Sequence, residues 1–340
     1  MHLLILGGTS FLGRALVEQA RNRNHTITVL NRGTKPAPDG ATSLVGDRLT
    51  PNGLDALDGL TFDAVIDTWA AEPPAAIEAM QKLQGRVGHY TIMSTVSVYD
   101  KTKLGDGDRL NDETTPVCEI VGPNATTSPT SLRRRGFEAA AEKILQGTPC
   151  LFARCGVMAG PYEASLIERS RLPWWLDRMR RGGRTLAPGP AHMPVQIIDV
   201  RDVAEFLVRA AERKLEGPYN LLSPPGSAAL GQVLELCREI TGNKAQLVWK
   251  TQEEIIEAGI KPFVELPLWL EHKTNDYATV YGWDTAKAKS AGLRCRPIED
   301  TVMDTWAWMT GINGPKHAPE GVQLKLLGLS PEREALVLDN

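Results

Sequence analysis

The sequence predicts an α/β protein built around a doubly wound parallel sheet. The chain opens with an apolar run, Leu3–Leu6, which has the length and composition of a buried parallel strand. Gly7-Gly8 end this run, and helix-like sequence begins at Phe11. Further β-branched segments then alternate with helical segments at the spacing of strand–helix units. A sheet of this kind binds its ligands outside the carboxyl ends of the strands.

The composition is that of an ordinary globular chain. Its 340 residues are 42% hydrophobic and 23% charged, enough for one large or two unequal domains. The net charge of −3 and the lack of a basic, aromatic patch argue against a nucleic-acid partner. No apolar run approaches the roughly 20 residues of a membrane span. We therefore expect no contact with a membrane.

The cysteines and the N-terminus predict a cytoplasmic protein. The five cysteines are scattered and lack C-x-x-C spacing, so we expect free thiols, without disulfides or a metal site. The N-terminal strand has neither the charged region nor the cleavage site of a signal peptide.

The first strand, turn and helix predict a site for the phosphates of a dinucleotide. In such a unit, backbone N–H groups of the turn and of the helix N-terminus point at one spot and favour an anion. Gly7 can adopt a left-handed conformation, and Gly13 lets the helix pack close to the strand. An ordinary strand-to-helix turn is the alternative, because short glycine motifs also match by chance. The expected phosphate contacts are Gly7, Thr9, Ser10, Phe11, Leu12 and Gly13.

The end of the second strand indicates which nicotinamide cofactor binds. Thr26–Leu30 is rich in β-branched residues and leads into Asn31 and Arg32, with Lys35 close behind. An acid here would recognise the free ribose of NAD, whereas a guanidinium suits the 2′-phosphate of NADP. We therefore expect NADP, with NAD as the alternative cofactor, unless Arg32 is merely a solvated strand end.

Later strand ends complete the predicted cofactor site. A short strand over residues 42–45 runs into Asp47, which is placed to accept a hydrogen bond from an adenine amino group or to cap a turn. Strands over residues 62–68 and 89–95 follow. The further residues expected at the cofactor are Asp47, Arg48, Thr68, Trp69, Ala70 and Ser94.

These motifs resemble those of the extended short-chain dehydrogenase/reductase superfamily, the NAD(P)-dependent epimerases, dehydratases and reductases. The matching segments are G-G-T-S-F-L-G at the first turn, N-R-G and G-D-R after the second and third strands, and S-T-V-S-V-Y after the fifth. Segments at 154–161, 196–204 and 217–221 agree with later strands and helices of the superfamily. The resemblance covers roughly residues 1–310 and implies a Rossmann fold. Ser10 replaces the usual middle glycine, as in the atypical branch.

The resemblance also implies a catalytic pattern from which this chain departs. Superfamily enzymes use a Ser or Thr after the fifth strand, here Thr95, with Tyr-x-x-x-Lys on the next helix. That helix should begin near Ser131, and the Tyr and Lys positions fall on Arg134 and Glu138. Arginine does not release a proton at working pH. The pair is either a helix-surface salt bridge, or Glu138 accepts the ribose hydroxyls while Arg134 polarises a substrate carbonyl.

Two tyrosines lie near the implied active site. Tyr99 and Lys103 formally fit Tyr-x-x-x-Lys, but their stretch has the sequence of a loop and cannot place both side chains on one helix face. Tyr99 is interpreted as the structural tyrosine that follows the fifth strand in the superfamily. Tyr162 is a catalytic candidate, because its loop borders the nicotinamide and the substrate in the superfamily.

The chain changes character near residue 160. We expect a dinucleotide-binding Rossmann domain over residues 1–160, to which the chain returns at about 195–225, a smaller C-terminal α/β substrate region over 161–194 and 226–310, and a tail over 311–340. Tryptophans in this region can form an aromatic wall, and arginines can meet an anion, or both can be structural. The candidate substrate residues are Trp174, Trp175, Arg178, His192 and Gln196.

Two local expectations complete the prediction for this region. Asp202 is expected to cap a helix over residues 203–212, and residues 262–270 are expected to form a lid or an interface segment.

These observations favour an NADP-dependent reductase or dehydrogenase acting on a small carbonyl or alcohol. Two alternatives keep the cofactor: an epimerase, dehydratase or isomerase without net redox, and a non-catalytic NADP-binding protein. Hydrolase motifs such as H-E-x-x-H and G-x-S-x-G are absent from the sequence. The expected partner is a small-molecule substrate, and the sequence is compatible with a homodimer.

Overall fold

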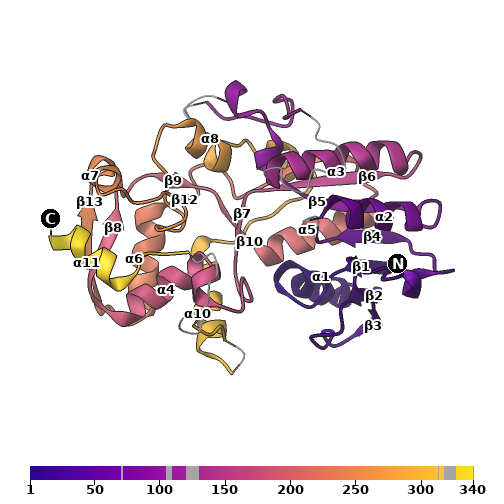
Figure 1. Ribbon diagram of the computed structural model, residues 1–340, viewed down its shortest axis with the longest axis horizontal. Helices are drawn as coiled ribbons and strands as arrows, with labels where there is room; N and C mark the ends of the chain where they lie inside the picture. Colours follow the sequence, from indigo (N-terminus) through magenta and orange to yellow (C-terminus); the bar gives the residue numbers. More distant parts are fainter. Residues whose placement is uncertain (70–71, 105–108, 120–129, 313, 318–326, 340) are drawn as a thin grey trace.

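A seven-stranded parallel sheet forms one end of the molecule (Figure 1). The computed structural model describes residues 1–69, 72–104, 109–119, 130–312, 314–317 and 327–339. The strand order is β11-β6-β5-β4-β1-β2-β3. The strands are β1 (His2–Leu6), β2 (Thr26–Asn31), β3 (Ala41–Val45), β4 (Ala64–Asp67), β5 (Tyr90–Thr95), β6 (Cys150–Cys155) and β11 (Gly217–Leu221).

The central strands of the sheet are buried on both faces, because their side chains alternate between two hydrophobic clusters. On β1, Leu3 and Ile5 pack on one face with helices α1 (Phe11–Asn22) and α5 (Val200–Glu212). Leu4 and Leu6 pack on the other face, with α2 (Pro73–Leu83) and α3 (Thr130–Ile144). This is the predicted doubly wound α/β fold.

The strand order reverses between β1 and β4. The chain runs outward from β1 through β2 to β3 and then returns to pair β4 with the other edge of β1. Such a reversal leaves a crevice at the carboxyl ends of the two strands, where doubly wound folds bind ligands.

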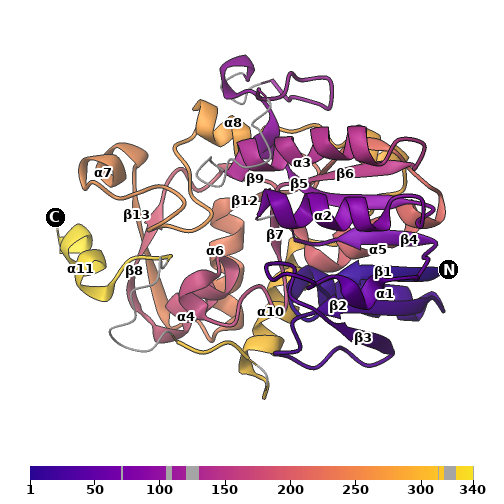
Figure 2. The same ribbon diagram turned by 45° about the vertical axis from the view of Figure 1, so that its right-hand side comes forward.

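Most of the second half of the chain, apart from α5 and β11, forms the opposite end of the molecule, and the two termini lie at opposite ends (Figures 1 and 2). Its core contains the buried Trp175 and Trp269. Its strands are β7 (Val157–Ala159), β8 (Gly183–Pro188), β9 (Pro194–Val195), β10 (Ile197–Asp199), β12 (Ala228–Ala229) and β13 (Ala245–Lys250), paired as β7–β10, β8–β13 and β9–β12.

Helices cover these short sheets. The α-helices are α4 (Leu172–Arg181), α6 (Leu230–Ile240), α7 (Gln252–Glu257), α8 (Asn275–Tyr281), α9 (Ala286–Ser290), α10 (Ile298–Thr310) and α11 (Pro331–Asp339). Single-turn 3-10 helices are η1 (Asp55–Leu57), η2 (Val96–Val98), η3 (Lys101–Lys103) and η4 (Ile167–Arg169). Within the described residues, none of the helices is long and apolar enough to cross a lipid bilayer. All five cysteines are free thiols, as predicted.

One local prediction is wrong. Asp199, not Asp202, caps α5, since the Asp199 carboxylate accepts a hydrogen bond from the Arg201 N–H. Asp202 instead pairs with Arg296. Residues 262–270, expected to form a lid or an interface segment, contribute Trp269 and other buried side chains to the C-terminal core, and their role stays a prediction.

Candidate dinucleotide site

A cavity of about 510 Å³ opens at the carboxyl ends of the central strands. Its wall combines the β1–α1 turn, the ends of β2, β3, β4 and β5, and one side chain of α3. The lining residues are Leu6, Gly7, Gly8, Thr9, Ser10, Phe11, Leu12, Gly13, Leu30, Asn31, Arg32, Thr34, Lys35, Gly46, Asp47, Arg48, Leu49, Thr68, Trp69, Met93, Ser94, Arg134 and Met158.

The predicted cofactor residues meet at this one cavity. Each of them that the structure describes lies on its wall. Ala70, the remaining one, lies outside the described residues. Arg134 is the only predicted catalytic residue on the wall.

The glycine turn is packed closely against neighbouring protein atoms. Gly7 and Gly8 have φ values of 121° and 99°, which side-chain-bearing residues rarely adopt. A Cβ atom on Gly7 would lie 2.3 Å from the Thr68 hydroxyl oxygen, and one on Gly13 would lie 2.5 Å from the backbone nitrogen of Gly8. The turn is therefore packed so closely that only glycine fits, and its backbone is left open toward the cavity.

The N-terminus of α1 supplies unpaired donors to the same spot. Ser10 is the N-cap, yet its side chain makes no capping hydrogen bond. The Arg14 N–H donates to the Ser10 carbonyl, which leaves the first-turn N–H groups of Phe11, Leu12 and Gly13 facing the turn. These N–H groups and the helix dipole favour an anion such as a pyrophosphate.

The end of β2 presents positive charge. Arg32 and Lys35 are exposed side chains on the cavity wall. The buried Asn31 shapes the backbone beneath them: its Oδ1 accepts from the Gly33 N–H at 2.8 Å, and its Nδ2 donates to Ser43 Oγ at 3.0 Å. Asn31 therefore stabilises the turn, while the side chains of Arg32 and Lys35 remain available to bind a ligand.

The end of β3 supplies Asp47 and Arg48, which behave differently. One oxygen of Asp47 accepts the Leu49 N–H, which leaves the other for a ligand. The Arg48 guanidinium is already engaged in a bidentate pair with Asp67, at 2.7 and 2.8 Å. It also lies over the Trp69 ring, 5.5 Å from the ring centroid. Arg48 therefore lines the cavity as part of its framework.

Arg134 brings a guanidinium into the cavity from α3. Its Nη1 donates to the Met93 carbonyl at 2.5 Å. Its Nε is enclosed and has no hydrogen-bond partner. Burial lowers the pKa of Arg134, although the Asp67 carboxylate partly opposes this effect. The cation is thus enclosed while its nearest acid is held by Arg48.

Glu138 does not form the predicted surface salt bridge with Arg134. Its side chain is fully buried. Both carboxylate oxygens are bound by Arg154 of β6, at 3.0 and 2.7 Å, and the Ser94 hydroxyl donates to Oε1 at 2.6 Å. On α3, Glu138 faces inward toward the sheet, where Arg154 of a neighbouring strand binds it at 2.7 Å and Arg135 of the same helix lies farther away, with Nη1 3.8 Å from Oε2. Glu138 is therefore unavailable to ribose hydroxyls.

A polar network continues inward from this pair. The Arg154 guanidinium lies over the Tyr99 ring, 4.6 Å from the centroid, and the Tyr99 hydroxyl donates to Asn220 Oδ1 at 2.7 Å. Burial raises the pKa of Tyr99 to about 12, against the opposing effect of Arg154, so its phenol stays protonated. Tyr99 has the structural role that the sequence predicts.

Thr95 and Tyr162 do not lie on the cavity wall. Thr95 caps η2, with its hydroxyl accepting from the Ser97 N–H. Tyr162 lines a smaller hollow of about 290 Å³ beside α1. Arg14 lies over its ring at 4.4 Å, and Trp308 packs at 5.2 Å. Phe11 borders both hollows, so Tyr162 is separated from the cofactor cavity by this side chain.

None of the predicted substrate residues lines this cavity. Trp174 and Trp175 are buried and pack edge to face in the C-terminal core. Arg178 is bound by Glu334 and by two backbone carbonyls. Gln196 bonds only backbone groups, at Ser223 and Trp283. His192 is exposed and lies outside the cavity.

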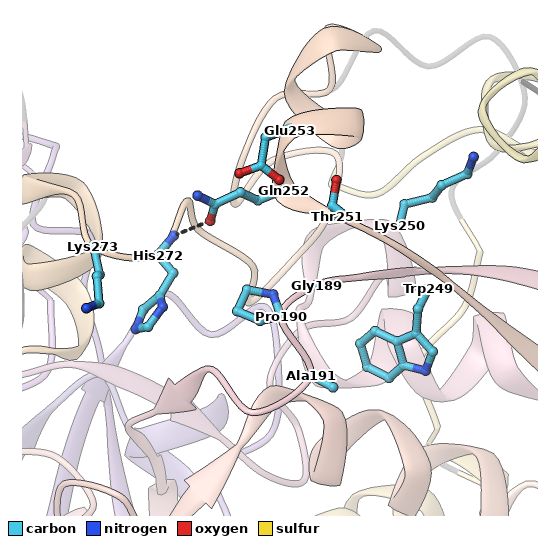
Figure 3. Close-up of a pocket in the computed structure, with 10 residues that line it drawn as sticks. All are labelled: Gly189, Pro190, Ala191, Trp249, Lys250, Thr251, Gln252, Glu253, His272 and Lys273. Atoms are coloured by element: carbon cyan, nitrogen blue, oxygen red, sulfur yellow. Dashed lines mark hydrogen bonds between the residues drawn. The ribbon is translucent and has the colours of Figure 1, made fainter.

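A second hollow, of about 570 Å³, lies in the C-terminal region (Figure 3). Gly189, Pro190 and Trp249 form one wall, and a hydrogen bond from the His272 N–H to Gln252 Oε1 closes the other. Its lysine at the rim, Lys250, pairs with Glu254. None of the residues proposed from the sequence lines this hollow, and it lies apart from the glycine turn.

Some wall residues were missed by sequence reasoning. They are mostly apolar or small: Leu6, Gly8, Leu30, Thr34, Gly46, Leu49, Met93 and Met158. Their common signal is position, since each lies within four residues of the carboxyl end of a strand. In the described part of the chain, no cluster of His, Cys, Asp and Glu could hold a metal ion.

The fold and the glycine-lined cavity define a Rossmann-type dinucleotide-binding protein. The model of the NAD dependent epimerase/dehydratase family matches residues 3–221, and the chain belongs to this family. This membership agrees with the resemblance seen in the motifs.

The individual relatives and solved structures have low sequence identity to this chain. "Photosystem II assembly factor Ycf39" of Synechocystis sp. is 26% identical over 269 residues, covering 73% of this chain and 70% of that protein. "Epimerase family protein SDR39U1" of Bos taurus is 27% identical over 247 residues, covering 67% and 76%. A UDP-glucose 4-epimerase from Thermus thermophilus, solved in complex with NAD, has a TM-score of 0.67 at 19% identity, covering 92% and 100%. At this identity the solved structure supports the fold alone.

Proposed function

We propose that the chain binds NADP(H) in the cavity and acts as an oxidoreductase on a small carbonyl or alcohol. The observation that carries the cofactor proposal is the pair of exposed cations at the end of β2. Arg32 and Lys35 stand where an acid would recognise a free ribose, on the same wall as the glycine turn. A 2′-phosphate would satisfy both charges.

The remaining wall residues have consistent roles in this proposal. The turn from Gly7 to Gly13 and the N-terminus of α1 hold the pyrophosphate, and Asp47 accepts the adenine amino group. The bound cofactor supplies the hydride. Arg134 donates a hydrogen bond to an oxygen of the bound substrate and keeps its own proton. The proton that completes the alcohol then comes from water, since the described wall holds no tyrosine, histidine or cysteine.

The test is a titration of the protein with NADPH and with NADH, followed by tryptophan and nicotinamide fluorescence. Arg32→Ala should weaken NADPH binding about 10- to 100-fold, the loss of one charge-assisted contact of about 1.5–3 kcal/mol. It should leave NADH nearly unchanged. Lys143→Ala removes an exposed cation from the far end of α3 and is the control. Equal weakening of both nucleotides by Arg32→Ala, or no binding of either by the unaltered protein, contradicts the proposal.

A cofactor-binding role without net redox is the second candidate. It is favoured by one observation: Glu138 is locked to Arg154 and Arg134 cannot release a proton, so the two positions that drive proton transfer in relatives are both changed. One relative is named as an assembly factor, and the family name covers epimerases. Tight binding of NADPH, without oxidation of the NADPH when a panel of carbonyl compounds is added, would favour this candidate.

A further inference from the structure

We propose that Arg134 forms an anion site inside the cavity, and that the small molecule bound beside the cofactor carries a carboxylate. This inference rests on the proposed function, and it deepens that function by naming a substrate class. It begins from a partly buried cation in the cavity wall whose charge no described neighbour pairs with directly.

The geometry leaves part of the guanidinium unused. Arg134 reaches from α3 to the end of β5, where Nη1 donates to the carbonyl of Met93. That contact uses one edge of the group, and Nε has no partner. The side chain lines the cavity beside Met93 and Met158. A planar ligand entering here can therefore meet the free edge of the guanidinium.

The acids near Arg134 are already paired. Asp67 is bound at both oxygens by Arg48, and Glu138 is bound at both oxygens by Arg154. A cation removed from water without a counter-ion is unfavourable by several kcal/mol. A neutral carbonyl supplies a hydrogen bond but no charge, whereas a carboxylate supplies both and matches the bidentate geometry of arginine.

The anions of the cofactor have other positions in the proposed site. The pyrophosphate is assigned to the turn after β1, and the 2′-phosphate to Arg32 after β2. Arg134 lies on the other side of the strand reversal, at β5, which is separated from β1 by β4. The anion that meets Arg134 therefore belongs to a second molecule.

The test compares acids with neutral compounds of the same shape. The unaltered protein, with and without NADPH, is titrated with 2-oxobutyrate and phenylpyruvate, and with the methyl ester of each, in a thermal-unfolding assay. At about ten times Kd, the acids should raise Tm by about 2 °C, and the esters should not. Arg134→Met should abolish the rise, and Arg134→Lys should weaken binding about tenfold, because lysine lacks the planar fork. Lys143→Met is the matched control for one lost charge.

A second readout needs no ligand. Because Arg134→Met removes a partly buried cation that no described carboxylate pairs with, we expect the variant to have a Tm at or above that of the unaltered protein. Equal effects of acids and esters, or an acid effect that survives Arg134→Met, overturn the inference, as does a Tm lowered by Arg134→Met. These results are distinct from a failure of the proposed function, which would appear as absent NADPH binding while the acid effect and its dependence on Arg134 persist.

Discussion

Glu138 and Arg154 show how a single altered position changes its surroundings. In the alignment that the sequence predicts, Glu138 takes the place of the superfamily's lysine, a cation that faces the ribose. Here the position carries an acid, and a strand neighbour supplies the compensating cation: Arg154 of β6 binds both carboxylate oxygens. Ser94, the predicted cofactor contact, donates to the same carboxylate. The negative charge of Glu138 is thus paired within the protein, and the carboxylate is not available to a ligand.

The pair predicts a strongly asymmetric mutational response. Arg154→Met leaves the fully buried Glu138 with the more distant Arg135, 3.8 Å from Oε2, as its remaining described counter-ion and should lower the free energy of unfolding by about 3–5 kcal/mol. The double variant Arg154→Met/Glu138→Leu removes both charges and should recover most of that loss. Urea unfolding followed by circular dichroism measures both values.

The same variants test whether Glu138 contacts the cofactor. If the pair is structural, the double variant should bind NADPH with an affinity within about threefold of the unaltered protein, since less than about 0.7 kcal/mol of binding is lost. A large loss of NADPH affinity in a well-folded double variant would contradict the assignment of Glu138 to the interior.

At the scale of elements, the packing of the β1–turn–α1 unit predicts that a glycine-to-alanine substitution in the helix destabilises the protein, although alanine favours helix formation. Gly13 lies within α1, where alanine would normally stabilise a helix by about 1 kcal/mol. Its Cβ would, however, lie 2.5 Å from the backbone nitrogen of Gly8. Because a backbone atom cannot move aside cheaply, Gly13→Ala should lower the free energy of unfolding by about 1–3 kcal/mol and weaken NADPH binding.

Thermal unfolding and nucleotide titration measure both effects of Gly13→Ala. Asn22→Ala, at the exposed end of the same helix, should change stability by no more than about 0.5 kcal/mol. A Gly13→Ala variant that is more stable and binds NADPH normally would show that the helix does not need the close approach.

The elements of the first half could be predicted because their signals are local. Apolar strands, the glycine turn and the residues at strand ends depend on short-range sequence, and parallel topology then gathers the strand ends at one edge. This is why Arg32 and Asp47, far apart in sequence, were both placed at the cavity that the structure contains.

Which groups a given polar side chain pairs with could not be predicted from the sequence in the same way. Arg178 and Gln196 have the polarity of ligand-binding residues, but long-range folding gives them Glu334 and backbone groups as partners. Trp175 has the spacing of a helix face, and only packing decides that this face meets the core. The sequence likewise could not show that Glu138 would find Arg154.

At the scale of the whole molecule, Glu163 lies where the chain passes from the first half to the second. Residue 163 follows the loop of Tyr162, and its carboxylate accepts the Arg171 N–H at the start of α4 at 2.6 Å. The other oxygen is enclosed without a partner. Burial raises the pKa of Glu163 to about 7, although nearby Arg171 opposes the rise. The junction of the two halves therefore holds a carboxyl that is protonated more readily when folded.

This junction predicts that stability falls as the pH rises toward neutrality. In the unfolded chain, Glu163 has its ordinary pKa of about 4.3, so between that pH and about 7 the folded state binds more protons. The stabilisation that comes from the neutral carboxyl is fully present below pH about 4.3. It is lost as the pH rises to about 7, which lowers the free energy of unfolding by up to roughly 3 kcal/mol. Urea unfolding at pH 5 and pH 8 should show this decrease, alongside contributions from other groups.

Glu163→Gln isolates the contribution of this one carboxyl. The amide keeps an oxygen for the Arg171 N–H but cannot ionise. The decrease in stability between pH 5 and pH 8 should therefore be smaller in the variant by up to roughly 3 kcal/mol, and the variant should be the more stable protein at pH 8. Glu142→Gln, on the exposed side of α3, should leave the pH profile unchanged. If Glu163→Gln and the unaltered protein show the same pH dependence, the carboxyl is ionised in the folded state at neutral pH, and the junction carries a charge that Arg171 balances.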